Sequence, residues 1–351
     1  MSTAEVILVV MWLGLTAYVL LGGADFGGGF WDFVAGGADR GRAQRDLIAH
    51  SIGPIWEANH VWLIFVLVVL WTAFPTAFAS VASTLIVPFT LAAFGIIARG
   101  AAFAFRKEMP EVGLQRLFGA AFATSSILTP FFLGTVAGAV ASGRVPVGNA
   151  AGDLIGSWTN PTSFLGGTLA VGVSAYLAAV YLTRDAERTG DEHLASLFRR
   201  RALAGGIVVG AVALAGIAIL AQDAPRLFQG LTTRALPLIV TSAAGGVASL
   251  LLLWQRRFTL ARLAAALAVA AVIWGWAAAQ YPEMLVGHLT ILEAAAPPAT
   301  LAALLWSLVA GGVILVPSLA LLFALFQRTG RRSEVDLPPQ SGAPDHASPS
   351  S

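Results

Sequence analysis

The sequence has no cysteine and few charged residues, and each lack excludes a class of protein. Without a thiol the chain forms no disulfide and cannot bind zinc or an iron–sulfur cluster through thiolates. Only 11% of the 351 residues are Asp, Glu, Lys or Arg, which is about half the share typical of soluble domains. With 57% hydrophobic residues and a mean hydropathy of +0.77, the chain is expected to lie in a membrane, with the helix bundle itself as its core.

Nine apolar segments occupy most of residues 1–327, and each is long enough to cross a bilayer as a helix of roughly 20 residues. They span residues 5–30, 47–74, 78–105, 117–141, 164–183, 202–221, 236–254, 260–280 and 300–326. We therefore predict an all-α, polytopic membrane protein with about nine transmembrane helices. Residues 328–351 are rich in Pro, Ser, Gly and charge, and we predict that they form a disordered cytoplasmic tail.

Basic residues are confined almost entirely to alternate joints between these segments. Of the 21 lysines and arginines, 17 follow odd-numbered segments or lie in the tail, whereas the opposite joints hold Arg144, Arg226 and Arg234. Short loops rich in Lys and Arg stay on the cytoplasmic side of a membrane. The sequence thus predicts an N-terminus outside and a C-terminus in the cytoplasm. The basic residues report this topology, so the pI of about 9.4 does not indicate a nucleic-acid partner.

The strongest functional signal is a polar cluster inside the second apolar segment. The chain reads Trp-Glu-Ala-Asn-His-Val-Trp from Trp56 to Trp62, which places Glu57, Asn59 and His60 near the middle of a predicted membrane helix. Ionisable groups at this depth are costly and by default indicate a functional site. Glu57 and His60 are three residues apart and share one face of the helix. The two tryptophans are deep enough to pack against a quinone or another flat cofactor, although core packing is the simpler account.

Two further ionisable residues lie within membrane segments, Asp25 in the first and Arg99 in the third. Counted at about 1.5 Å of rise per residue, both lie on the cytoplasmic side of the membrane centre, as Glu57 does. Desolvation raises the pKa of a buried carboxyl, so such a group can bind and release protons near neutral pH. Asp25, Glu57 and His60 therefore suit a path that carries protons from the cytoplasm toward the membrane centre.

Structural roles for the same residues remain open. Asp25 and Arg99 are expected at similar depth on adjacent antiparallel helices, where a buried ion pair would set the register of the helices. Glu57 would hydrogen-bond to a neighbouring helix, Asn59 would have a structural role, and packing suits His60 better than metal or haem ligation. We predict no metal site and no catalytic residue in this chain.

Residues 22–29 read Gly-Gly-Ala-Asp-Phe-Gly-Gly-Gly, and residues 56–63 read Trp-Glu-Ala-Asn-His-Val-Trp-Leu. Together these two motifs resemble subunit II of the cytochrome bd-type quinol oxidases. The family patterns are close to D-G-F-D-x-G-x-G and W-[DE]-x-N-x-V-W-L. The first Asp of the family pattern corresponds to Gly22 here, and only the second is kept, as Asp25. A proton path in this chain would therefore have one carboxylate fewer on its first helix.

The resemblance implies a respiratory terminal oxidase that couples quinol oxidation to the reduction of O2 to water in a bacterial cytoplasmic membrane. Subunit II forms a heterodimer with a homologous subunit I, which carries haems b and d. Subunit II itself is expected to bind no haem, although it can hold a structural quinone. It stabilises subunit I and offers carboxylates, at the Asp25 and Glu57 positions, to a proton path from the cytoplasm. The implied fold is two four-helix bundles plus one peripheral helix, and the further implied partners are quinol, lipid and small accessory subunits.

Two other classes of membrane protein remain open from the residues alone. A secondary transporter also combines intramembrane charges with glycine-broken helices, but neither an inverted repeat nor a pair of interrupted helices is evident. A purely structural membrane subunit would carry the same buried polar residues without moving protons. Co-purification distinguishes these classes, because an oxidase subunit brings a haem-bearing partner with it.

Overall fold

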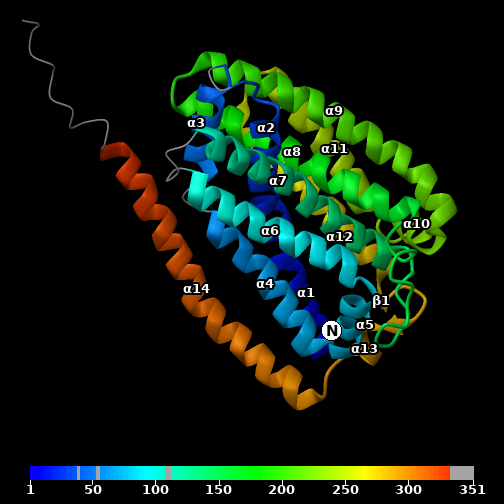
Figure 1. The fold of residues 1–351 in the computed structure, drawn as a ribbon. Coiled ribbons are helices and arrows are strands. Elements are labelled where there is room, and N and C mark those ends of the chain that lie inside the picture. Colours follow the sequence, from blue (N-terminus) through cyan, green and yellow to red (C-terminus); the bar gives the residue numbers. More distant parts are fainter. Residues whose placement is uncertain (38–39, 53–55, 107–111, 333–351) are drawn as a thin grey trace, which may run out of the picture. The chain divides into compact units, whose positions relative to one another are not determined.

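The protein is almost entirely helical (Figure 1). The computed structural model describes residues 1–37, 40–52, 56–106 and 112–332, without the side chains of 52, 56–58, 106, 112, 115, 116, 316, 319, 320 and 322–332. Within these residues the helices are α1 Thr3–Ala17, η1 Tyr18–Gly22, α2 Gly23–Phe33, α3 Arg42–Ile52, α4 Trp56–Ala73, α5 Pro75–Thr84, α6 Ile86–Arg106, α7 Val112–Ala141, α8 Pro161–Arg188, α9 Glu192–Asp223, α10 Pro225–Thr232, α11 Leu236–Trp254, α12 Phe258–Gln280, α13 Ile291–Ala294 and α14 Pro298–Arg332. One antiparallel hairpin joins β1 (Glu283–Leu285) to β2 (Leu289–Thr290).

The long apolar helices confirm the predicted fold class. In the described part of the chain, eight helical stretches are long and apolar enough to cross a membrane, and Asn59–Ala73 is a shorter apolar helix. Each of these corresponds to one of the nine predicted segments. The first span is continuous from Thr3 to Phe33, through α1, η1 and α2. The chain is therefore an all-α, multi-pass membrane protein.

Helix boundaries depart from the predicted segments at prolines and at polar joints. α5 begins at Pro75, because a proline fits the first turn of a helix but ends the helix before it. The predicted segment 78–105 is divided at Leu85, between α5 and α6. α9 begins well before its apolar part, because the Asp191 side chain accepts a hydrogen bond of 2.9 Å from the Leu194 N–H and caps the helix.

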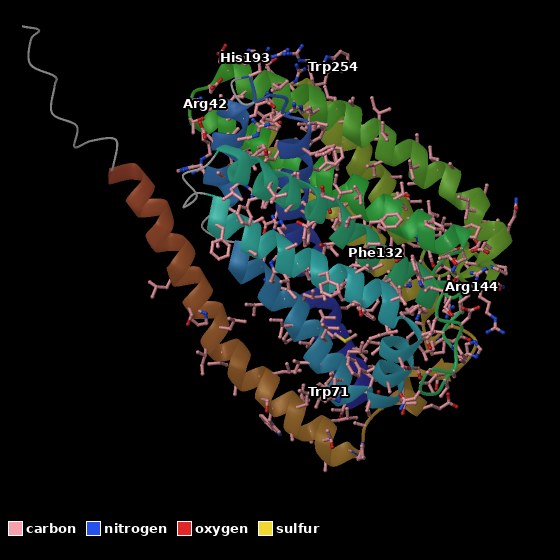
Figure 2. All side chains as sticks on the ribbon, viewed as in Figure 1. Arg42, Trp71, Phe132, Arg144, His193 and Trp254 are labelled. Carbon is pink, nitrogen blue, oxygen red and sulfur yellow. The ribbon has the colours of Figure 1, made fainter. Side chains whose placement is uncertain are left out.

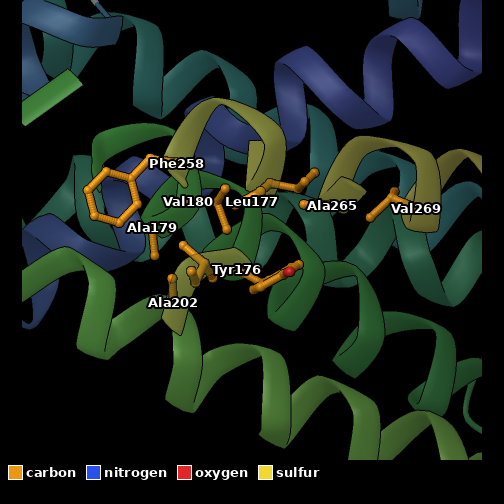
Figure 3. Packing of buried hydrophobic residues seen from close by; sticks show 10 residues of the cluster. Tyr176, Leu177, Ala179, Val180, Ala202, Phe258, Ala265 and Val269 are labelled. Atoms are coloured by element: carbon orange, nitrogen blue, oxygen red, sulfur yellow. The ribbon is translucent and has the colours of Figure 1, made fainter. Parts of the chain in front are cut away.

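Residues Met1–Leu301 form one compact unit, and α8 lies at its centre. α8 packs against α2, α7, α9 and α12. Part of this core is the cluster in Figure 3, made of Tyr176, Leu177, Ala179, Val180, Ala202, Leu253, Phe258, Ala261, Ala265 and Val269. The Tyr176 hydroxyl donates to Ser249 at 2.6 Å, and Ser249 donates to the Ala261 carbonyl at 3.0 Å, so these buried hydroxyls are satisfied.

Glycines allow α2, α7 and α8 to approach at backbone distance. A Cβ atom added to Gly27 would overlap the Ser174 carbonyl oxygen, and one added to Gly134 would overlap the Gly166 carbonyl oxygen. Only glycine fits at such positions. Close approach through small residues is typical of helix pairs in membranes, and it holds the first span firmly against the central helix.

The β hairpin, α5, α10 and α13 lie at the end of the bundle opposite α3 (Figure 1). At this end Arg144 forms an ion pair of 2.5 Å with Asp223, whose carboxylate also accepts 2.6 Å from the Thr162 hydroxyl. In the loop before α8, backbone N–H groups of Gly156 and Ile155 hold the pKa of the Asp153 carboxyl below its ordinary value. The loops at this end are thus tied together by charge-assisted hydrogen bonds.

Residues Ala302–Ser351 form a second unit, which contains most of α14. This helix includes Pro317. The division into a membrane domain at 1–327 and a tail at 328–351 stays a prediction, and residues 333–351 lie outside the described residues.

Candidate functional site

The first membrane span is interrupted by the π-helical turn η1 shortly before Asp25. π turns are rare, occur as single turns inside α-helices and are frequent at functional sites. Asp25 follows in the first turn of α2 and is only 3% exposed. Its carboxylate therefore lies in the interior of the bundle, where a polar group is tolerated only with hydrogen-bond partners.

Asn59 of α4 supplies one of those partners. Its Nδ2 donates a hydrogen bond to Oδ2 of Asp25, and Asn59 is itself buried, at 4% exposure. The asparagine of the second-span motif thus joins the second span to the first. An ionised carboxylate has about four acceptor sites, so Asp25 retains acceptor capacity for other donors.

Arg99 of α6 reaches the same place from the third span. Its Nη2 donates a hydrogen bond of 2.8 Å to the main-chain carbonyl of Asp25, and its Nε donates one of 3.1 Å to the Ser126 hydroxyl on α7. The side chain is 2% exposed, which makes it one of the largest fully buried side chains among the described residues. We call Asp25, Asn59, Arg99 and Ser126 the carboxylate cluster; it joins α2, α4, α6 and α7.

Aromatic rings enclose the guanidinium of Arg99. Its Cζ atom lies 4.9 Å from the ring centre of Phe26 and 5.0 Å from that of Phe122. Attraction between a cation and an aromatic face strengthens when both are desolvated. Ser126 in turn donates 2.6 Å to the Phe122 carbonyl. These contacts, with the nearby carboxylate of Asp25, make the burial of a permanent positive charge tolerable.

His60 lies beside the cluster, between two aromatic rings of the first span. Its imidazole makes edge-to-face contacts with Phe26, at 5.7 Å between ring centres, and with Tyr18, at 6.4 Å. This arrangement is compatible with packing and also places a titratable ring alongside the residues between Tyr18 and Phe26. Its role in a proton path stays a prediction.

The remaining predicted site residues lie on α4. The side chains of Trp56 and Glu57 lie outside the described residues, although both belong to the helix. The Trp62 ring packs edge-to-face against Phe65 of its own helix, at 6.2 Å. A quinone beside the tryptophans therefore stays a prediction. Among the described residues, no group of three or more His, Cys, Asp or Glu side chains could hold a metal ion.

Sequence reasoning brought Asp25 and Arg99 together by depth and gave Asn59 a structural role, but it missed two neighbours. Ser126 carries no sequence signal, because serines inside membrane helices usually bond to their own helix. A second missed residue is Tyr18, which reads as an ordinary aromatic until the π turn is known. Arg99 was expected to pair with Asp25 directly or through water, and the direct contact that the structure shows is with the main-chain carbonyl of that residue.

Comparison with known proteins gives one family. A family model described as "Cytochrome bd terminal oxidase subunit II" matches residues 3–326. A putative cytochrome bd menaquinol oxidase subunit II of Bacillus subtilis (strain 168) is 22% identical over 344 residues, which cover 94% of this chain and 97% of that protein. A bd oxidase structure from Geobacillus thermodenitrificans superimposes with a TM-score of 0.74 at 27% identity, over 93% of this chain and 99% of the other.

Two further relatives match over shorter stretches. The cytochrome bd ubiquinol oxidase subunit 2 of Bacillus subtilis (strain 168) is 29% identical over 131 residues, 36% of this chain and 38% of that protein. The cytochrome bd-I ubiquinol oxidase subunit 2 of Escherichia coli (strain K12) is 28% identical over 202 residues, 54% of this chain and 51% of that protein. Both alignments span less than two thirds of these relatives.

Proposed function

The chain belongs to the cytochrome bd terminal oxidase subunit II family, and we propose that it works as subunit II of a respiratory quinol oxidase that reduces O2 to water. The observation that carries this proposal is the family match over residues 3–326, together with the agreement of the fold over 93% of the chain. Family membership also disfavours the secondary-transporter alternative. The chain is one subunit of a membrane oxidoreductase, and the redox chemistry belongs to the complex.

We assign the haems of the complex to a homologous partner, subunit I. We expect none of the described residues of this chain to ligate a haem. His60 lies near the start of the apolar helix Asn59–Ala73, and its ring packs against Phe26 and Tyr18. The contribution of this chain is therefore to support subunit I and to serve proton transfer. Quinol, lipid and accessory subunits are further partners that we infer from the family alone.

Within the complex, Asp25, Glu57 and His60 are proposed to carry protons from the cytoplasm toward the membrane centre. Asn59 orients the Asp25 carboxylate, and Arg99 fixes the main chain that bears it. The positive charge of Arg99 offsets the negative charge of the carboxylate when Asp25 is ionised. Asp25 can therefore exchange a proton without moving its helix, because its position depends on its neighbours and not on its own charge alone.

The direction of this path rests on the distribution of basic residues. Figure 2 shows Arg42 and His193 at one end of the bundle and Arg144 at the opposite end. We assign the Arg42 end to the cytoplasm, because 17 of the 21 lysines and arginines belong to joints on that side or to the tail. Asp25 and Asn59 then lie in the cytoplasmic half of the membrane, where proton uptake begins, in a bacterial cytoplasmic membrane.

A second candidate role of the carboxylate cluster is purely structural, and the hydrogen bonds that it makes between helices support this role. Asp25, Asn59, Arg99 and Ser126 join four helices. Asp25→Asn distinguishes the two roles, since an amide keeps the volume and can hydrogen-bond but cannot carry a proton.

The test is made on the complex purified through this chain. If Asp25 carries protons, Asp25→Asn should have a normal haem content, and its O2 consumption per haem should be at least severalfold slower. Normal turnover per haem would leave only the structural role. Absence of a haem-bearing partner in the preparation of the unmodified chain would overturn the oxidase assignment itself.

A further inference from the structure

Tyr18 carries a buried hydroxyl that makes no hydrogen bond to the described residues. The residue begins the π-helical turn η1, is 6% exposed, and its hydroxyl oxygen has no hydrogen-bond partner among the described residues. Buried polar groups are almost always hydrogen-bonded, and an exception indicates a functional role or a partner supplied from elsewhere. Loss of this hydroxyl would remove no hydrogen bond that stabilises the described fold.

The ring of Tyr18 lies across Gly22, in the direction of Asp25. A Cβ atom added to Gly22 would lie 3.0 Å from Cδ2 and Cε2 of Tyr18 and 3.7 Å from its Cζ. The ring therefore occupies the space that a side chain at position 22 would need. Position 22 is also where the family pattern has an aspartate. A hydroxyl-bearing ring thus lies where an aspartate at position 22 of this chain would begin its side chain.

Tyr18 contacts one of the proposed proton carriers, His60. The imidazole of His60 contacts both Tyr18 and Phe26, so it spans the two turns that separate Tyr18 from Asp25. Tyr18 precedes Asp25 by seven residues, or about 10 Å along the span, and so lies nearer the membrane centre.

We propose that Tyr18 is a further member of the proton path and takes over the task of the carboxylate that Gly22 lacks. A phenol hydroxyl is both donor and acceptor. Its oxygen accepts a proton from the preceding carrier of the path on the Asp25 side, while its own proton passes to a water molecule toward the membrane centre, and the hydroxyl then rotates back. The net charge of the tyrosine is the same before and after. This inference rests on the proposed function and adds a residue to it.

The test compares Tyr18→Phe with Tyr176→Phe in the purified complex with its haem-bearing partner. Tyr18→Phe keeps the ring over Gly22, so we expect normal haem content, O2 consumption per haem at least threefold lower, and a larger slowing in D2O than in the unmodified complex. Tyr176→Phe removes a hydroxyl that is bonded to Ser249 and not to any residue of the proposed path, and should leave turnover and the D2O effect unchanged. Normal turnover with a normal D2O effect in Tyr18→Phe would overturn the proposal. Loss of haem from that variant would also overturn it, because the hydroxyl would then be structural.

A rescue variant tests whether the Tyr18 hydroxyl takes the place of a carboxylate at position 22. Tyr18→Ala vacates the space over Gly22, and Tyr18→Ala combined with Gly22→Asp places a carboxylate there. We expect the double variant to recover at least half of the turnover lost in Tyr18→Ala. If turnover does not recover, Tyr18 does not replace the carboxylate that Gly22 lacks. Asp25→Asn distinguishes this inference from the proton path itself. If turnover is slow in Asp25→Asn but normal in Tyr18→Phe, the path stands and only the role of Tyr18 is rejected. If turnover is normal in Asp25→Asn, the proton path itself is rejected.

Discussion

The guanidinium of Arg99 donates a hydrogen bond of 2.8 Å to the main-chain carbonyl of Asp25, while the carboxylate of Asp25 accepts a hydrogen bond from the Asn59 side chain. Arg99 therefore anchors the helix that carries the acid and does not use up the acceptor sites of the acid. The same guanidinium binds Ser126 through a different nitrogen. The third span thus holds the first and the fourth in register around a carboxylate that stays chemically available.

Arg99→Lys should fail to replace arginine, although it keeps the charge. One ammonium cannot reproduce the planar fork that reaches the Asp25 carbonyl and Ser126 together. Removing one member of a buried charged network costs about 3–5 kcal/mol, so we expect much less haem-containing complex in membranes for Arg99→Lys and for Arg99→Gln. Arg226→Gln, at an exposed pair with Glu283, is the control and should assemble normally. Normal assembly of Arg99→Lys would show that charge alone matters.

Gly27→Ala should disrupt the contact between the first span and α8. The added Cβ would overlap the Ser174 carbonyl oxygen, and main chain cannot rotate away as a side chain can. We expect a lower melting temperature and lower yield of the complex. Gly210→Ala is the matched control, because no atom lies within 4 Å of a Cβ added there, and alanine favours helix over glycine by about 1 kcal/mol. Equal stability of the two variants would contradict the close approach.

Glu57→Gln is expected to slow turnover while leaving assembly and haem content near normal. Glutamine keeps the volume and the hydrogen-bonding capacity of glutamate but cannot carry a proton. Glu57→Asp should retain more activity, because it keeps the acid on a shorter arm, and His60→Ala should be milder because its contacts with Phe26 and Tyr18 suit packing. The measurement is O2 consumption with excess quinol, per haem. Normal turnover of Glu57→Gln would leave a structural role.

Reporter fusions should show the N-terminus outside and the C-terminus in the cytoplasm. A reporter after Gly41 and one at the C-terminus are expected to be active as cytoplasmic fusions, and one at Gly148 as an external fusion. The reason is the concentration of Lys and Arg in joints on one side. The opposite result at all three positions would reverse the side from which protons enter.

The chain expressed without its partner should bind no haem. His60 is packed between Tyr18 and Phe26, and we expect the purified single chain to show no haem absorption band. Deletion of this chain should remove the haem-bearing partner from membranes, because a large apolar surface of the partner would lose its cover. A stoichiometric haem on the single chain would contradict the assignment of haem to subunit I.

The sequence by itself determined the class of protein and singled out the candidate residues of the site. Apolar segments of spanning length and scarce charge admit few alternatives to a helical membrane bundle. Because charge in such a segment is costly, Asp25, Glu57 and Arg99 were visible as candidates without coordinates. The two motifs then indicated the family that the comparison confirmed. These inferences depend on composition and order along one chain.

Only the tertiary structure decided which atoms meet. Whether Arg99 bonds a carboxylate or a carbonyl depends on helix rotation, and the π turn η1 alters rotation within the first span. Ser126 has no distinguishing neighbours in the sequence, and the position of the Tyr18 ring depends on the missing side chain of Gly22. Periodicity gives the direction of a side chain only to within a fraction of a helix turn, whereas hydrogen bonds need a few tenths of an ångström. The contacts between helices are therefore set by packing and not by local sequence.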